Sequence, residues 1–178
     1  MQNNNPLIQE NINVLKQGLE LLNQLCDDSY LEAKHPFSDY GIGSHFRHCL
    51  DFYQSFLEGI VKGSIDYDDR NRDGRIEKDR MIAISKFQSV IHRLEGLSPV
   101  DDQMTLLVRL EDEQEQESAS SWSYSSVQRE LQALVSHTVH HYALIAIMLQ
   151  LKGFQLAEEF GVAPSTLRRW RQAAPCAQ

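Results

Sequence analysis

The sequence predicts an all-α fold, an up-down bundle of four long helices with a small β-ribbon or loop inserted before the last helix. Two observations lead to this prediction. Four stretches repeat their apolar residues at intervals of three and four, the spacing that gives a helix one buried face. Between the third and fourth stretches, two short segments have the composition and length of β-strands.

The helices are expected over residues 6–26, 43–62, 76–97 and 125–151. Pro6 suits the first position of a helix, because proline has no N–H to leave unpaired there. Ser44 is available to cap the second helix, and Gly63 is a natural end for it. Residues 104–110 and 122–126 are the two expected strands.

The length and charge of the chain limit its organisation and its partners. Its 178 residues suit one domain over residues 1–178, in which residues 154–178 form a tail packed on the bundle. The 17 basic and 25 acidic side chains give a formal charge of −8, whereas nucleic acids and anionic membranes attract surfaces rich in lysine and arginine. We therefore expect a small-molecule substrate as partner, with no nucleic acid and no membrane. The exposed helix faces would also suit a homodimer.

Three features indicate a cytoplasmic protein. The cysteines, Cys26, Cys49 and Cys176, are odd in number and form no CxxC pair, as is usual in a reducing compartment. The first residues have neither the basic nor the apolar segment of a secretory signal. The longest apolar run, residues 142–151, is shorter than the roughly 20 residues that span a bilayer.

Five of the seven histidines fall in two short windows, each on a predicted helix. His137 and His141 lie one turn apart in the apolar stripe of the last helix, so both imidazoles could bind one metal ion. A single histidine in such a stripe is more often a hydrogen-bonded core residue, but two adjacent buried imidazoles would each need a partner. The second helix offers a third ligand. Its periodicity places His45 inside the apolar face and His48 at the edge, and therefore favours His45.

A motif around the second helix favours His48 instead of His45. Tyr40 stands eight residues before His48, and the helix continues as HCLD, while residues 136–141 read SHTVHH. Together these segments resemble the DinB-like superfamily of four-helix metalloproteins, whose members pair a histidine on the second helix with HxxxH on the fourth. The resemblance covers about residues 6–153, in the same order of helices.

The resemblance implies one divalent metal ion bound by His48, His137 and His141, with His45 as the alternative to His48. Imidazole ligands do not distinguish zinc, nickel, iron and manganese. Better-studied members include thiol-dependent S-transferases, which implies a low-molecular-weight thiol as a further cofactor. The implied function is a metal-dependent transferase or hydrolase that activates a thiol or a water for reaction with a small molecule. The alternative is a non-catalytic metal-binding stress or regulatory protein, or a dimeric scaffold.

Further side chains are candidates for the same site. Asp51 lies one turn beyond the ligand of the second helix and could orient an imidazole or act as an acid or base. Tyr53 and His140 are similar candidates, and core packing is the alternative role for both. Arg70 and Arg72, in a polar loop before the third helix, could bind an anionic thiol or carboxylate substrate, or could simply be solvated.

Overall fold

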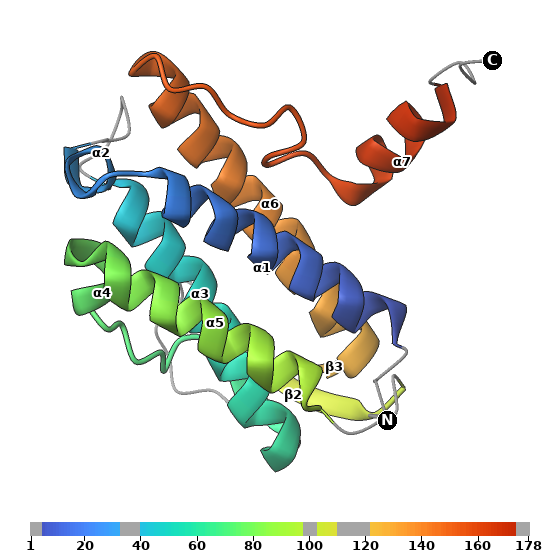
Figure 1. Cartoon of the computed structure of the whole chain (residues 1–178). Coiled ribbons are helices and arrows are strands. Elements are labelled where there is room, and N and C mark those ends of the chain that lie inside the picture. Colours follow the sequence, from blue (N-terminus) through green and yellow to red (C-terminus); the bar gives the residue numbers. More distant parts are fainter. Residues whose placement is uncertain (1–4, 33–39, 98–102, 110–121, 174–178) are drawn as a thin grey trace.

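The structure is a computed structural model that describes residues 5–32, 40–97, 103–109 and 122–173. These residues are mainly helical and include a small three-stranded sheet, which confirms the prediction at this level (Figure 1). The helices are α1 (Pro6–Gln24), α2 (Asp27–Glu32), α3 (Ile42–Lys62), α4 (Arg75–Lys78), α5 (Arg80–Glu95), α6 (Val127–Leu151) and α7 (Pro164–Ala173). The strands are β1 (Ser64–Asp66), β2 (Thr105–Arg109) and β3 (Trp122–Ser126).

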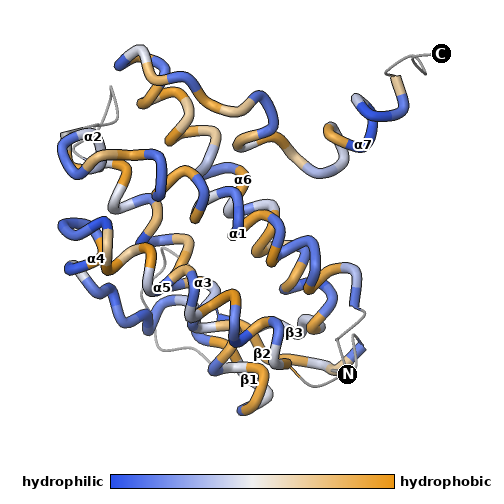
Figure 2. The backbone as a smooth tube through the Cα atoms, in the orientation of Figure 1, coloured by the Kyte–Doolittle hydropathy of each residue, from blue (hydrophilic) through white to orange (hydrophobic). Residues whose placement is uncertain are grey.

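The core lies between the four long helices. Both α1 and α3 pack against α5 and α6, so each of these helices contacts two of the others. Hydrophobic and hydrophilic residues alternate along them, as one-sided burial requires (Figure 2). At the centre, the fully buried Phe46 ring meets Phe87 and Tyr142 edge-on, with ring centroids 5.4 and 5.9 Å apart.

Among the described helices, α6 is the one whose length and composition would allow it to cross a membrane. This is weak evidence, because the core helix of a soluble protein meets the same criterion, and α6 packs against α1 and α3. The expected cytoplasmic location and the absence of a membrane partner therefore stay predictions.

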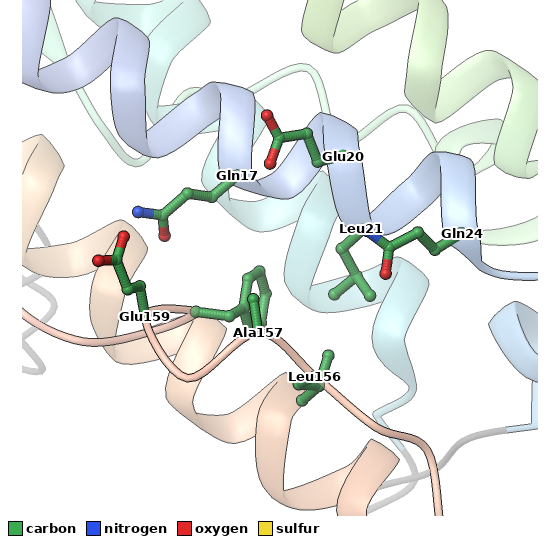
Figure 3. A pocket seen from close by; sticks show the side chains of 8 residues that line it. Gln17, Glu20, Leu21, Gln24, Leu156, Ala157 and Glu159 are labelled. Carbon is green, nitrogen blue, oxygen red and sulfur yellow. The ribbon is translucent and has the colours of Figure 1, made fainter.

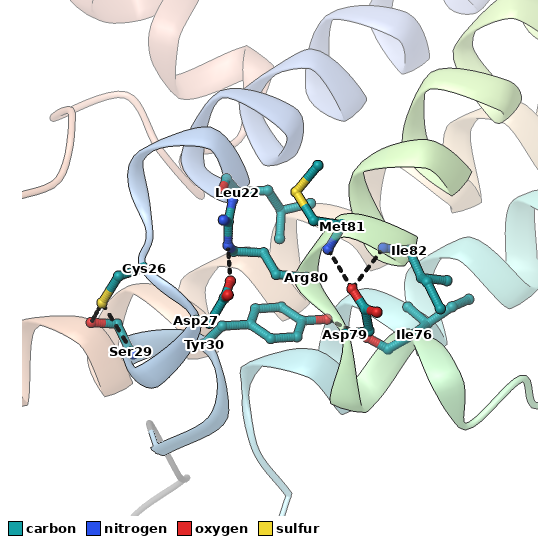
Figure 4. A network of polar contacts seen from close by, with 10 residues as sticks. All are labelled: Leu22, Cys26, Asp27, Ser29, Tyr30, Ile76, Asp79, Arg80, Met81 and Ile82. Carbon is teal, nitrogen blue, oxygen red and sulfur yellow. Dashed lines mark hydrogen bonds and ion pairs between the residues drawn. The ribbon is translucent and has the colours of Figure 1, made fainter.

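The helix predicted over residues 76–97 is divided at Asp79. The backbone of Asp79 is extended, and its carboxylate accepts hydrogen bonds from the backbone N–H groups of Met81 and Ile82 at 2.8 and 3.1 Å (Figure 4). Asp79 thus caps α5 and separates it from the short helix α4. α4 also contacts α2, because the Tyr30 hydroxyl of α2 donates a hydrogen bond to the backbone carbonyl of Ile76 in α4.

The sheet lies where α3 ends and α6 begins. β1 follows α3 and runs parallel to β2, while β2 runs antiparallel to β3. β3 leads directly into α6, where the Ser126 side chain caps the helix by accepting a hydrogen bond from the backbone N–H of Arg129. The structure therefore adds β1 to the two predicted strands, and it places Tyr67, just after β1, beside α6 through a hydrogen bond to Glu130.

The segment after α6 returns along the outside of the helices. Phe160 stacks on Tyr142 with ring centroids 4.9 Å apart. Gly161 has φ of 72° and lies so close to the backbone of Tyr142 that a Cβ atom would not fit without a shift. Farther along, Arg168 of α7 pairs with Glu10 of α1 at 3.2 Å. The segment and α1 border an open pocket of about 100 Å³ (Figure 3), lined by side chains that include Gln17, Glu20, Leu21, Gln24, Leu156 and Glu159.

Two of the three cysteines lie within the described residues, and both are free. Cys26 is exposed, and Cys49 is buried in the core. Residues 174–178 of the predicted tail, including Cys176, lie outside the described residues.

Candidate metal centre

Two neighbouring helices bring the predicted histidines together. α3 carries His45 and His48, α6 carries His137 and His141, and the two helices pack against each other. The ring centroid of His48 lies 4.9 Å from that of His137 and 4.7 Å from that of His141. The pair on α6 faces α3 because residues at i and i+4 lie on one side of a helix.

The nitrogen atoms of three of these rings converge. His137 Nε2 lies 3.2 Å from His48 Nε2 and 3.1 Å from His141 Nε2. One ligand atom from each of the three residues lies within 4.8 Å of the others. In a tetrahedral zinc site, with Zn–N bonds of about 2.0–2.1 Å, two ligand nitrogens are about 3.3 Å apart. His48, His137 and His141, the histidine triad, could therefore bind one metal ion.

Burial keeps the histidine triad neutral. It lowers the pKa of His48 to about 3, with a further contribution from the neighbouring His137. It lowers the pKa of His137 to about 4, with a further contribution from His140. The pKa of His141 is also lowered strongly, again mainly by burial. An imidazole must be neutral to bind a metal ion, and at neutral pH all three rings of the histidine triad meet this condition.

His45 lies next to the histidine triad and contacts it through a different atom. Its Nδ1 is 2.9 Å from His141 Nδ1, and its side chain is only 9% exposed. A metal ion on His141 Nε2 would leave the proton of that ring on Nδ1. The Nδ1–H group could then donate a hydrogen bond to His45 Nδ1. The structure thus groups His48 with the pair on α6 and places His45 where it can orient His141.

Asp51 is engaged by an arginine. Burial raises the pKa of this carboxyl group, and the neighbouring Arg47 opposes the rise. Arg47 Nη1 lies 2.7 Å from Asp51 Oδ2, and its Nε pairs with Glu77 on α4. α4 comes this close because Gly43 has no side chain, since a Cβ atom there would overlap the backbone of Glu77. Arg47, which stands between the two histidines of the HFRH segment, was not predicted from the sequence as a site residue.

Tyr53 and His140, two further candidates, lie in different surroundings from each other. Tyr53 is fully buried and donates a hydrogen bond to Asn11 Oδ1 of α1 at 2.8 Å, because it lies well around α3 from His48. His140 is exposed, with its ring centroid 5.3 Å from that of His141. His140 therefore borders the histidine triad, whereas Tyr53 belongs to the core between α1 and α3.

The two loop arginines also differ from each other. The Arg70 guanidinium lies 4.7 Å from the ring centroid of Phe52 and contributes to the low pKa of His48 and His137. Arg72 is exposed, and its charge acts on Asp51. The ring centroid of Phe52 is 4.2 Å from that of His137, so Phe52 contacts both Arg70 and the histidine triad. This role of Phe52 could not be predicted from the sequence, because Phe52 has the position of an ordinary residue in an amphipathic helix.

A pocket opens beside the histidine triad. Its volume is about 250 Å³, and its lining residues are Tyr40, Ser44, His45, Arg47, His48 and His141. Small-molecule sites usually have about 300–1,000 Å³, so this pocket lies just below that range and suits a small ligand.

Comparisons of the chain with models of protein families, with curated proteins and with solved structures gave no match. Membership of the DinB-like superfamily therefore stays a prediction.

Proposed function

We propose that this protein binds one divalent metal ion on His48, His137 and His141, and that it is a metal-dependent enzyme with a DinB-like four-helix bundle. The convergence of the three Nε2 atoms carries this proposal, because His137 Nε2 has one proton or one lone pair and cannot make a full hydrogen bond to both neighbouring Nε2 atoms, whereas one metal ion can bind all three. The order of the four long helices and their mutual packing agree with such a bundle.

Three protein ligands are typical of catalytic metal sites, which leave a coordination position open for water or substrate. A divalent ion bound there would lower the pKa of a water or a thiol at the open position and so supply a nucleophile near neutral pH. The pocket beside His48 and His141 provides room for a small substrate. We infer transfer of a thiol to a small electrophile, or hydrolysis of a small molecule, as the reaction class.

The residues around the histidine triad have separate roles in this proposal. His45 orients His141 through the contact between their Nδ1 atoms. Arg47 pairs with Asp51 and Glu77, which fixes the wall of the pocket and the position of the Asp51 carboxylate, the candidate acid or base. Arg70, next to Phe52, adds positive charge that would attract an anionic substrate group.

The experiment is to measure turnover with defined metals and two probes. The probes are p-nitrophenyl acetate for hydrolysis, and chlorodinitrobenzene with glutathione or cysteine for thiol transfer. We expect turnover of at least one probe that is lost with a chelator, restored by one metal, and absent in His48→Ala. The exposed His92 on α5 provides the control, since His92→Ala should retain turnover.

The second candidate is a metal-binding protein without catalytic activity. It is favoured by the engagement of Asp51 with Arg47, because an acid or base held in an ion pair is less available for proton transfer. Stoichiometric metal binding without metal-dependent turnover of any substrate would support this candidate and contradict the enzymatic proposal.

A further inference from the structure

A second pocket lies between the sheet and α6, on the side of the structure where β3 leads into that helix. Its volume is about 410 Å³, larger than that of the pocket beside His48. Much of its wall is apolar, with Phe52, Val108 and Leu134 among the lining residues. We call it the sheet pocket. His137 also lines it, so the sheet pocket reaches one member of the histidine triad.

The wall of the sheet pocket contains a buried carboxylate, that of Glu130, which is 7% exposed. Its Oε2 accepts a hydrogen bond from the Tyr67 hydroxyl at 2.9 Å, and its Oε1 accepts one from the Ser125 hydroxyl. Glu130 also lies in the first turn of α6, where the helix dipole favours negative charge. Two hydroxyl donors and the N-terminal end of α6 therefore face this carboxylate.

No cation neutralises this charge within the described ranges. The ion pairs found there leave out Glu130, and both of its hydrogen bonds come from neutral hydroxyl groups. Arg129, the basic residue that lines the sheet pocket, is exposed and so is screened by solvent. A buried anion without a cation is costly for a protein unless something else provides the opposite charge.

Aromatic rings surround the same space. Phe52 and Tyr67 stack with ring centroids 4.8 Å apart, and Tyr124 of β3 lines the opening with its side chain 84% exposed. Aromatic faces attract cations, and here Phe52 already contacts the Arg70 guanidinium. An apolar pocket with aromatic rings and one buried carboxylate has the features that recognise an organic ammonium group.

We propose that the sheet pocket binds a small molecule that carries an ammonium group on an apolar body. The ammonium group pairs with Glu130, and the apolar part lies against Phe52, Val108 and Leu134, toward His137. The binding itself does not depend on a metal. The further step, that this molecule is a substrate of the metal centre, rests on the proposed function, because it uses the position of His137 in both sites.

The test compares two probes of nearly equal shape, 2-phenylethylamine and 2-phenylethanol, by titration of ¹⁵N-labelled full-length protein in a chelator. We expect the amine to shift backbone amides around Ser125, Glu130 and Ala133, and to bind about tenfold or more tightly than the alcohol, as a charged hydrogen bond requires. In Glu130→Gln this preference should disappear while the alcohol binds as before. The control Glu158→Gln removes the same charge from an exposed position and should keep the preference.

A second variant tests the site if Glu130→Gln does not fold. Ala133→Trp places a large ring in the sheet pocket and should weaken both probes. Equal affinity of the wild type for amine and alcohol would overturn the proposal, as would shifts centred on other residues or an unchanged preference in Glu130→Gln. Since the chelator removes metal, these outcomes are independent of whether the histidine triad binds a metal ion.

Discussion

The low pKa values of the histidine triad predict that the metal-free protein loses stability on mild acidification. In the unfolded chain the three histidines titrate near a pKa of about 6.5, whereas in the folded protein the pKa is about 3 for His48 and about 4 for His137, and that of His141 is also lowered. Between these values the unfolded state binds more protons, so stability falls as the pH falls below about 6.5. At pH 5 the free energy of unfolding is lower by about 2 kcal/mol for each histidine that titrates independently. The upper limit for the three coupled rings is therefore about 6 kcal/mol.

The assay is urea unfolding of metal-free protein at pH 7 and pH 5, in parallel with His137→Gln and with His92→Gln as the control. Other groups titrate in the same range, so the informative quantity is the difference in pH dependence between wild type and variant. His137→Gln should lose up to about 2 kcal/mol less than wild type between the two pH values. His92 is exposed on α5, and its variant should behave as wild type. An equal loss in wild type and His137→Gln would refute the reasoning.

Two further predictions concern the parts of the fold that position the site. Gly43→Ala should destabilise the protein by about 1–3 kcal/mol in thermal unfolding, because its Cβ would overlap the backbone of Glu77. Gly74→Ala, where a Cβ meets nothing within 4 Å, should be nearly neutral, and equal effects of the two would contradict this account. Asp79→Ala should cost about 1 kcal/mol in urea unfolding through loss of the α5 cap, whereas Asp79→Asn should retain most of that stability. Equal losses in the two variants at Asp79 would count against the cap.

The long helices could be predicted from sequence because a buried face leaves a regular pattern of apolar residues. Their interruptions could not be predicted in the same way. The pattern continues through Asp79, and only the extended backbone there, held by the bonds to Met81 and Ile82, shows that α4 and α5 are separate. β1 was missed for a related reason, since its three residues become a strand by pairing with β2, far along the chain.

The histidines show how far periodicity can identify ligands. The helical wheel predicted His45 inside the apolar face and His48 at its edge, and the structure agrees, because His45 is 9% exposed and His48 is partly exposed. Burial alone does not make a ligand, however. His48 is grouped with His137 and His141 because its Nε2 points at theirs, and this depends on how α3 faces α6. Glu130 was missed because one acidic residue in the first turn of a helix is common and gives no sign of a pocket.

Binding of one metal ion by His48, His137 and His141 underlies the proposed function. The most direct measurement is metal content per chain by mass spectrometry after reconstitution with zinc, nickel, iron or manganese, in wild type and in alanine variants of His45, His48 and His137. We predict about one metal ion per chain in wild type, loss in His48→Ala and His137→Ala, and weaker but retained binding in His45→Ala. Retention in His48→Ala with loss in His45→Ala would make His45 the third ligand, and absence of metal from the wild type under all four conditions would contradict the account.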